Sequence, residues 1–331
     1  MKVNNLQNSP QFKGVYNNKI LLKGLEFASN HSASFVAGAT LLSSTVLRPL
    51  AINSIDSVDE DNKKIFTAES VSSGLTKFAL AEMIAIPVEN GIKAIDKSKE
   101  KYLNKETLQN LSPESYKFLT KLIKLGSNFI SAIPKSMIGV ALIPVVHKLL
   151  FNKQKQPDKI NDSNISFKGK LADNSAKIIS KVINNEAVQN FANKFQASDK
   201  NLAKNVSVAT DILLCSTSIL STQKSKKIDK DRKKPLIFNK ALSTAISLLA
   251  GYKIDELIQK TGKKSIEKFI QVNKNNPNLQ KYLDGINIVR PTVIFALLYY
   301  ALIPVITAFA SDKLNEQTKN VSSGGVLWKV F

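Results

Sequence analysis

The chain has 331 residues, of which 43% are hydrophobic and 22% charged, and its 47 lysines and arginines against 26 aspartates and glutamates give a net charge of +21. The apolar content is sufficient for a folded core and excludes wholesale disorder, while the positive charge favours anionic partners, either phospholipid or nucleic acid. The single cysteine, Cys215, excludes an internal disulfide and any cysteine-based metal cluster.

The first half of the chain begins with a polar and basic stretch, 1–24, for which we expect a flexible arm and no signal peptide. Three apolar runs follow, each long enough for a helix: 27–47, 74–95 and 125–151. An acidic segment, 56–69, separates the first two runs, and a basic helical segment, 96–124, separates the last two. This half therefore predicts three apolar helices joined by charged connections.

The second half follows a polar segment at 152–170, which we expect to be a linker. It again contains three apolar runs: 206–222, 238–252 and 291–311. A strongly basic loop, 224–234, separates the first two, and residues 312–331 are predicted to form a C-terminal tail. Apolar spacings of three and four dominate without sustained two-residue alternation, so the sequence predicts an all-α protein.

Two six-residue words indicate an internal duplication. Ala-Leu-Ile-Pro-Val-Val at 141–146 returns as Ala-Leu-Ile-Pro-Val-Ile at 301–306, and five further short matches occur in the same order in both halves. We therefore predict a bundle of about six apolar helices built from two three-helix halves, the first helical repeat at 25–151 and the second at 171–311.

The charge of the loops leads to a prediction of membrane topology. A helix needs about 20 mostly apolar residues to cross a bilayer, and the 21 residues of 291–311 carry no charge. The equivalent loops 56–69 and 224–234 have opposite charge, which predicts opposite faces of a membrane and inverted halves. We therefore expect a multi-pass membrane protein with a cytoplasmic N-terminus, and with 96–124 and 224–234 also on the cytoplasmic side.

Four charged residues lie within or beside the apolar runs: Arg48, Glu82, Glu89 and Asp211. Charges inside a membrane must pair or line a polar cavity, so these four are candidates for an intramembrane polar path. The alternative is that they lie on the wet faces of amphipathic helices. Pro144 and Pro304 each remove a backbone donor and are predicted to break their helices, either as markers of a site or as two copies of one structural kink.

The basic loop supplies candidate contacts to anionic lipid headgroups: Lys224, Lys226, Lys227, Lys230, Arg232, Lys233 and Lys234. The two histidines, His31 and His147, give no support to a catalytic or metal site, so we expect no enzyme activity, no metal and no cofactor. The sequence thus predicts a pore or carrier for a small solute. The alternatives are a peripheral helical scaffold on an anionic membrane surface and, third, a nucleic-acid-binding protein, which the lack of interleaved aromatics in the basic loop disfavours.

Overall fold

The computed structural model describes residues 16–151, 170–196 and 199–323, and within these ranges it contains helices and their connections but no strand. The prediction of an all-α fold is confirmed. The predicted linker, 152–170, lies outside the described residues except for Lys170, where a helix begins.

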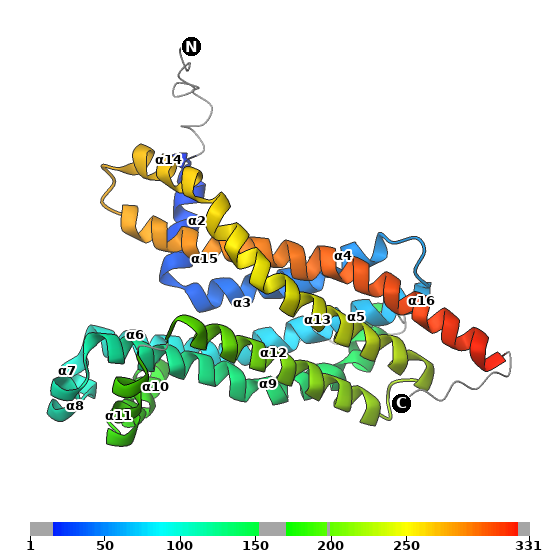
Figure 1. Cartoon of the computed structure of the whole chain (residues 1–331), viewed down its shortest axis with the longest axis horizontal. Helices are drawn as coiled ribbons and strands as arrows, with labels where there is room; N and C mark the ends of the chain where they lie inside the picture. The colour runs from blue at the N-terminus through cyan, green and yellow to red at the C-terminus, as the bar shows by residue number, and fades with distance from the viewer. Residues whose placement is uncertain (1–15, 152–169, 197–198, 324–331) are drawn as a thin grey trace, which may run out of the picture.

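Six long helical segments account for most of the described chain (Figure 1). Three of them are interrupted by a short π-helical segment but continue through it. In chain order the six are α3-η2-α4 (Ser32–Leu42, Ser43–Leu47 and Arg48–Asn53), α5-η3-α6 (Glu60–Leu80, Ala81–Ala85 and Ile86–Lys97), α9 (Pro113–Phe151), α12 (Asp199–Lys224), α13 (Lys230–Thr261) and α15-η5-α16 (Leu279–Leu297, Leu298–Leu302 and Ile303–Ser323).

Shorter helices precede or connect the long ones: α2 (Lys19–Asn30), α7 (Lys99–Tyr102), α8 (Lys105–Asn110), α10 (Lys170–Ile183), α11 (Glu186–Phe195) and α14 (Lys263–Asn273). Helix α2 begins inside the predicted N-terminal arm, 1–24, and α16 continues through 312–323 of the predicted tail. The rest of both segments, 1–15 and 324–331, lies outside the described residues.

The six long helices form a closed ring. In each half the first helix packs on the second and the second on the third, α9 packs on α12 between the halves, and α15-η5-α16 packs back on α3-η2-α4. Helices α5 and α13 also touch across the ring. A ring of this kind encloses a central space whose lining comes from the inward faces of all six helices.

All six long helices reach the same end of the ring, which we call the loop end because the connections 54–59 and 225–229 lie there. Arg232 at the start of α13 forms ion pairs with Asp59 (3.3 Å) and Asp61 (2.8 Å) at the start of α5. Asp312 of α16 accepts a hydrogen bond from Asn62 of α5 (2.6 Å). His147 of α9 lines a pocket together with Asp61 and Arg232.

This geometry corrects the predicted topology. The loops 56–69 and 224–234 do not lie on opposite faces; their opposite charges attract each other across one face. Since α4 and α12 both end there, the two halves have the same orientation, and the inverted arrangement is wrong. Segment 96–124 begins at the other end of the ring, at the end of α6, so it does not share a side with 224–234 as predicted.

Prolines explain where the π-helical segments occur. Each segment ends two residues before a proline, namely Pro49, Pro87 or Pro304. Proline lacks the N–H, and its ring conflicts with the carbonyl four residues earlier, so a wider turn relieves the clash. Neither Pro144 nor Pro304 ends its helix, since α9 continues past Pro144 and α16 directly follows η5 at Pro304; that the two prolines kink their helices stays a prediction.

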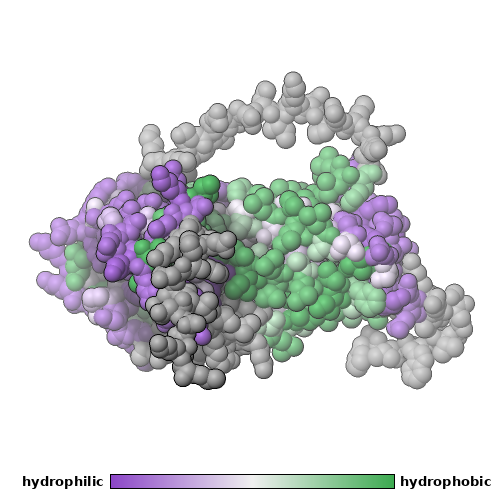
Figure 2. All heavy atoms as spheres, turned by 90° about the horizontal axis from the view of Figure 1, so that it is seen from above, coloured by the Kyte–Doolittle hydropathy of each residue, from purple (hydrophilic) through white to green (hydrophobic). Residues whose placement is uncertain are grey.

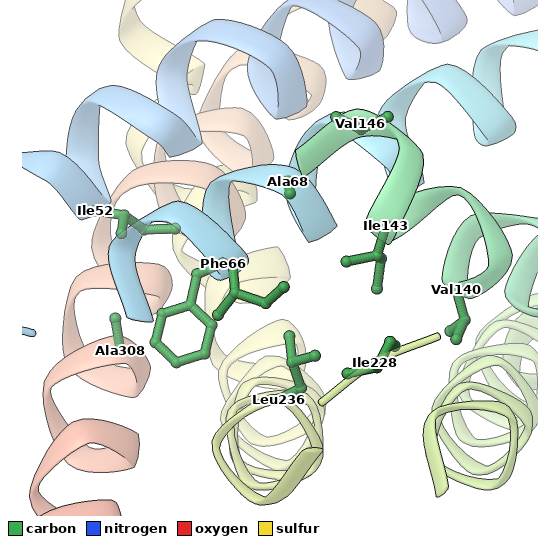
Figure 3. Close-up of a cluster of buried hydrophobic side chains, with 10 residues drawn as sticks. Ile52, Phe66, Ala68, Val140, Ile143, Val146, Ile228, Leu236 and Ala308 are labelled. Carbon is green, nitrogen blue, oxygen red and sulfur yellow. The ribbon is translucent and has the colours of Figure 1, made fainter. Parts of the chain in front are cut away.

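A hydrophobic core fills the ring at the loop end (Figure 3). Side chains from five of the long helices and from the 225–229 connection meet there: Ile52, Ile65, Phe66, Ala68, Val140, Ile143, Val146, Ile228, Leu236 and Ala308. At the opposite end the buried apolar residues form two separate clusters, one between α6, α9, α10 and α11 and one between α2, α14 and α15. The ring is therefore packed shut at the loop end and divided into two lobes at the other.

The outer surface of the ring is apolar in its middle on the face that Figure 2 draws. Figure 2 shows hydrophobic side chains gathered across the centre of the molecule, with hydrophilic side chains at both ends. Four of the long segments are long and apolar enough to cross a membrane: Ser32–Asn53, Glu60–Lys97, Pro113–Phe151 and Leu279–Gln317. A helix of 38 residues such as the second is about 57 Å long, more than the ~30 Å of a bilayer core. That these four segments span a membrane, and α12 and α13 with them, stays a prediction.

Glycine permits a close approach of α2 and α15. A Cβ added to Gly285 of α15 would collide with the backbone of Leu25 in α2, whose carbonyl carbon would lie 2.7 Å away and Cα 2.9 Å away. We expect Gly285→Ala to destabilise the protein by about 1–3 kcal/mol, because backbone atoms cannot move aside as side chains can. Thermal unfolding of the detergent-purified protein measures the change.

Gly38→Ala is the matched control, since nothing lies within 4 Å of its added Cβ. Alanine is the better helix former, so equal stability losses in both variants would contradict the packing of α2 on α15.

Candidate functional site

A cavity of about 430 Å³ lies inside the ring and is lined by side chains of all six long helices. Six of the lining residues carry a charge: Arg48, Glu69, Lys77, Lys135, Asp211 and Lys240. Eight contribute hydroxyl groups: Ser73, Ser136, Ser218, Ser243, Thr244, Ser247, Tyr299 and Tyr300. The interior of a ring with an apolar outer surface is thus polar.

Helical spacing produces this lining. Glu69, Ser73 and Lys77 follow one another at four-residue intervals on α5, which places all three on one helix face. Ser243, Thr244 and Ser247 repeat the pattern on α13. The sequence therefore contained a second signal, namely polar residues at spacings of three and four within apolar runs. This signal indicates most of the lining residues that the presence of a charge beside an apolar run does not.

The inner part of the cavity, nearest the loop end, holds a buried charge cluster. Glu69 of α5 accepts from Arg48 of α4 (3.0 Å) and from Lys240 of α13 (3.3 Å), so one carboxylate joins three long helices. Arg48 is only 9% exposed and also contacts Asn239 through its Nη2 atom (3.4 Å). The Nε atom of Arg48 and the Nδ2 atom of Asn239 are buried and have no hydrogen-bond partner in the described part of the chain.

The outer part of the cavity contains the remaining charges and the aromatic rings. The ammonium group of Lys77 lies 5.8 Å from the ring centroid of Tyr300, a cation–π geometry. The hydroxyl of Tyr299 donates to the backbone carbonyl of Ser247 (3.3 Å). Lys135 and Asp211 also line this part, from α9 and α12.

Burial changes along the cavity. At its inner end Val140 and Ile143 are buried, 6% and 1% exposed. Farther from the loop end Lys77 and Lys135 are only partly buried, and Asp211 is exposed. The cavity is therefore closed by apolar side chains toward the loop end, and its more exposed lining residues lie farther from that end.

The four residues predicted for a polar path divide into two groups. Arg48 and Asp211 line the cavity, so the structure brings these two together. Glu82 is exposed, and neither Glu82 nor Glu89 is part of the cavity lining. Glu82 and Glu89 lie in an apolar run but not on the face of the helix that lines the cavity. A charged residue in such a run can also lie on the outer face of its helix or on a face packed against a neighbouring helix.

Glu89 instead holds two helices together. Its carboxylate accepts from the Ser32 hydroxyl (2.6 Å) and from the backbone N–H of Ala33 (2.8 Å), at the start of α3, and pairs with Lys93 (2.7 Å). A helix N-terminus has unpaired N–H groups and a partial positive charge, so a carboxylate there is stabilised. The buried charge of Glu89 is accounted for by this cap.

The basic loop is only partly free to meet lipid. Arg232 is occupied by Asp59 and Asp61 and also donates to Asn62 (2.9 Å), while Lys233 donates to the carbonyl of Gln223 (2.8 Å). The other five basic residues are exposed: Lys224, Lys226, Lys227, Lys230 and Lys234. For these five, contact with anionic headgroups stays a prediction.

No protein-family model, curated protein or solved structure matches this chain. The functional argument therefore rests on the cavity and on the arrangement of the helices around it.

Proposed function

We propose that this chain is a non-enzymatic, multi-pass membrane protein that carries a small solute through the central cavity of its helix ring. The observation that carries the proposal is a polar cavity inside apolar helices, closed by apolar side chains at one end and lined by more exposed residues toward the other. A pore needs openings at both ends, whereas a carrier exposes its binding site to one side at a time, so the closed loop end favours a carrier over a pore.

The packing of the two halves supports this proposal. Helix α2 precedes the first long helix and packs on α15, the start of the last helix in the other half. Helix α11 precedes α12 and packs correspondingly on α9, the last long helix of the first half. Such equivalence is expected of a duplication with both copies in the same orientation, related by an axis along the membrane normal. We propose that arrangement in place of inverted repeats.

The orientation of the protein in the membrane depends on which side of the membrane the loop end faces. The N-terminal side of the first long helix lies opposite to the loop end, so a cytoplasmic N-terminus and a cytoplasmic loop 224–234 are mutually exclusive. Because the opposite end carries the basic segment 96–124 and the lysines of α2, we keep the N-terminus cytoplasmic and place both loops outside.

Single-cysteine labelling tests spanning and orientation together. In a Cys215→Ser background we introduce Asp56→Cys and Lys226→Cys in the two loops and Ser98→Cys at the opposite end of the ring; each of these three positions is exposed. We expect a membrane-impermeant maleimide to label both loop positions in intact cells and to label position 98 only after lysis.

The alternatives give different patterns. Labelling of one loop without the other would restore inverted halves and overturn the parallel arrangement. Protection of all three positions in intact cells, with release of the protein by alkaline carbonate, would identify a peripheral scaffold and overturn the proposed function.

A further inference from the structure

The charges that line the cavity do not balance. Four basic residues (Arg48, Lys77, Lys135 and Lys240) face two acidic ones (Glu69 and Asp211), which leaves a surplus of two positive charges. In a space shielded by low-dielectric apolar helices such an excess attracts and concentrates anions far more strongly than the same charges would in water.

The inner cluster retains a donor that no protein atom uses. Glu69 is shared between Arg48 and Lys240, yet the buried Nε–H of Arg48 has no acceptor among the described residues. Buried donors are almost always satisfied by protein, by water or by a bound group. An acceptor entering the cavity would complete the hydrogen bonding of this guanidinium.

The outer part of the cavity provides two further cations. Within the described part of the chain, neither Lys77 nor Lys135 has a carboxylate oxygen within ion-pair distance, and both line the outer part of the cavity. Two ammonium groups on one cavity wall repel each other unless an anion lies between them. An oxyanion in the outer part of the cavity meets these two lysines together with the single carboxylate of Asp211, and the Arg48 guanidinium lies deepest.

Size and chemistry of the lining restrict the ligand further. A volume of about 430 Å³ lies in the range of cavities that hold small molecules. The hydroxyl groups of Ser243, Thr244 and Ser247 line the wall formed by α13 and can exchange hydrogen bonds with hydroxyl or carbonyl groups of a ligand.

We infer that the cavity binds a small, water-soluble organic anion whose carboxylate or phosphate group is held by Lys77 and Lys135, with Arg48 as the innermost donor. This inference rests on the proposed function, since it names the class of solute that the ring carries. A lipid with an anionic headgroup has the same charged chemistry, and the experiment below separates the two sources.

The native cysteine supplies the probe, because Cys215 is the only cysteine of the chain and it lines this cavity. We compare its rates of modification by a sulfonate-bearing and a trimethylammonium-bearing methanethiosulfonate, each normalised to the rate with a free thiol. The anionic reagent is expected to react faster by at least about tenfold, as a positively charged cleft focuses anions. The double variant Lys77→Gln/Lys135→Gln is expected to remove most of that preference.

The matched control is Lys97→Gln/Lys181→Gln, which removes the same net charge at two exposed positions outside the cavity and should leave the preference unchanged. The single variants Lys77→Gln and Lys135→Gln replace the double variant if it does not fold. Equal normalised rates for the two reagents, or a preference for the cationic one, would overturn the inference.

Protection of Cys215 then identifies the ligand class. In protein purified without anionic lipid, we expect glycerol phosphate or succinate, at about four times its Kd, to slow modification about fivefold relative to glucose and choline, because protection grows as one plus the ratio of ligand concentration to Kd. Protection by phosphatidylglycerol vesicles alone would assign the cavity to a lipid headgroup and overturn a soluble ligand. Protection by glucose or choline alone would overturn the anion class but leave the carrier proposal intact, because cysteine labelling at positions 56, 226 and 98 tests that proposal independently.

Discussion

Glu69→Ala is expected to lower the free energy of unfolding by about 3–5 kcal/mol, the largest effect of any single substitution considered for this protein. The carboxylate of Glu69 is the shared partner of Arg48 and Lys240. Its removal leaves two positive charges close together in a buried position with nothing to neutralise them. The loss should appear as a lower unfolding temperature of the detergent-purified protein, followed by circular dichroism.

Two variants make this prediction specific. Glu82→Ala removes an exposed carboxylate from the same long helix and should change stability by less than about 0.5 kcal/mol. Arg48→Met/Glu69→Leu removes both partners of the closest pair and should cost less than Glu69→Ala alone, because it leaves one uncompensated charge in place of two. If Glu69→Ala unfolds at the same temperature as Glu82→Ala, the buried cluster does not exist as described.

Asp312→Ala is expected to cost about 2–3 kcal/mol, the second largest effect, because its carboxylate closes the loop end from α16. Asp312 is 2% exposed and accepts from the backbone N–H of Asp59 (3.2 Å) and from the amide of Asn62 (2.6 Å), which is itself fully buried. These donors lie at the start of α5, where the helix dipole adds to the attraction. Alanine leaves the Asn62 amide buried and unpaired and removes the acceptor of the Asp59 N–H.

A comparison of Asp312→Ala with Arg232→Ala measures how much burial of an ionic contact contributes to the free energy of unfolding. Arg232→Ala removes two ion pairs and a hydrogen bond, yet Asp59 and Asp61 are more than half exposed, so we expect a loss of at most about 1 kcal/mol. Thermal unfolding at low and high salt separates the two sites, since salt screens the exposed pairs more than the buried carboxylate. A larger loss for Arg232→Ala than for Asp312→Ala would contradict this account of the loop end.

The local sequence was sufficient for the secondary structure and for part of the cavity. Apolar spacings of three and four predicted the helices, and the rule that charges avoid lipid selected Arg48 and Asp211, both of which line the cavity. The same rule also selected Glu82 and Glu89, which do not. Glu69 was missed because it belongs to the acidic segment 56–69, whereas Lys77, Lys135 and Lys240 lie inside the apolar runs 74–95, 125–151 and 238–252 and were not selected.

The orientation of the two halves relative to each other cannot be read from short stretches of sequence. Matching words near Pro144 and Pro304 indicate repetition, but a repeat has the same sequence whether its two copies are parallel or inverted. The opposite charges of 56–69 and 224–234 fit two arrangements equally well, separation across a membrane or pairing on one face. The ion pairs of Arg232 with Asp59 and Asp61 show that the two segments pair on one face.

The sequence by itself thus determined that the chain is helical, rich in apolar segments long enough for a membrane, and basic. The tertiary structure decided which side chains point inward, because a charge in an apolar helix is satisfied by whatever the neighbouring helix presents. Glu89 meets the free N–H groups of α3, whereas Glu69 meets two cations from distant parts of the chain. Such partners are brought together by ring closure, and no spacing along the sequence encodes them.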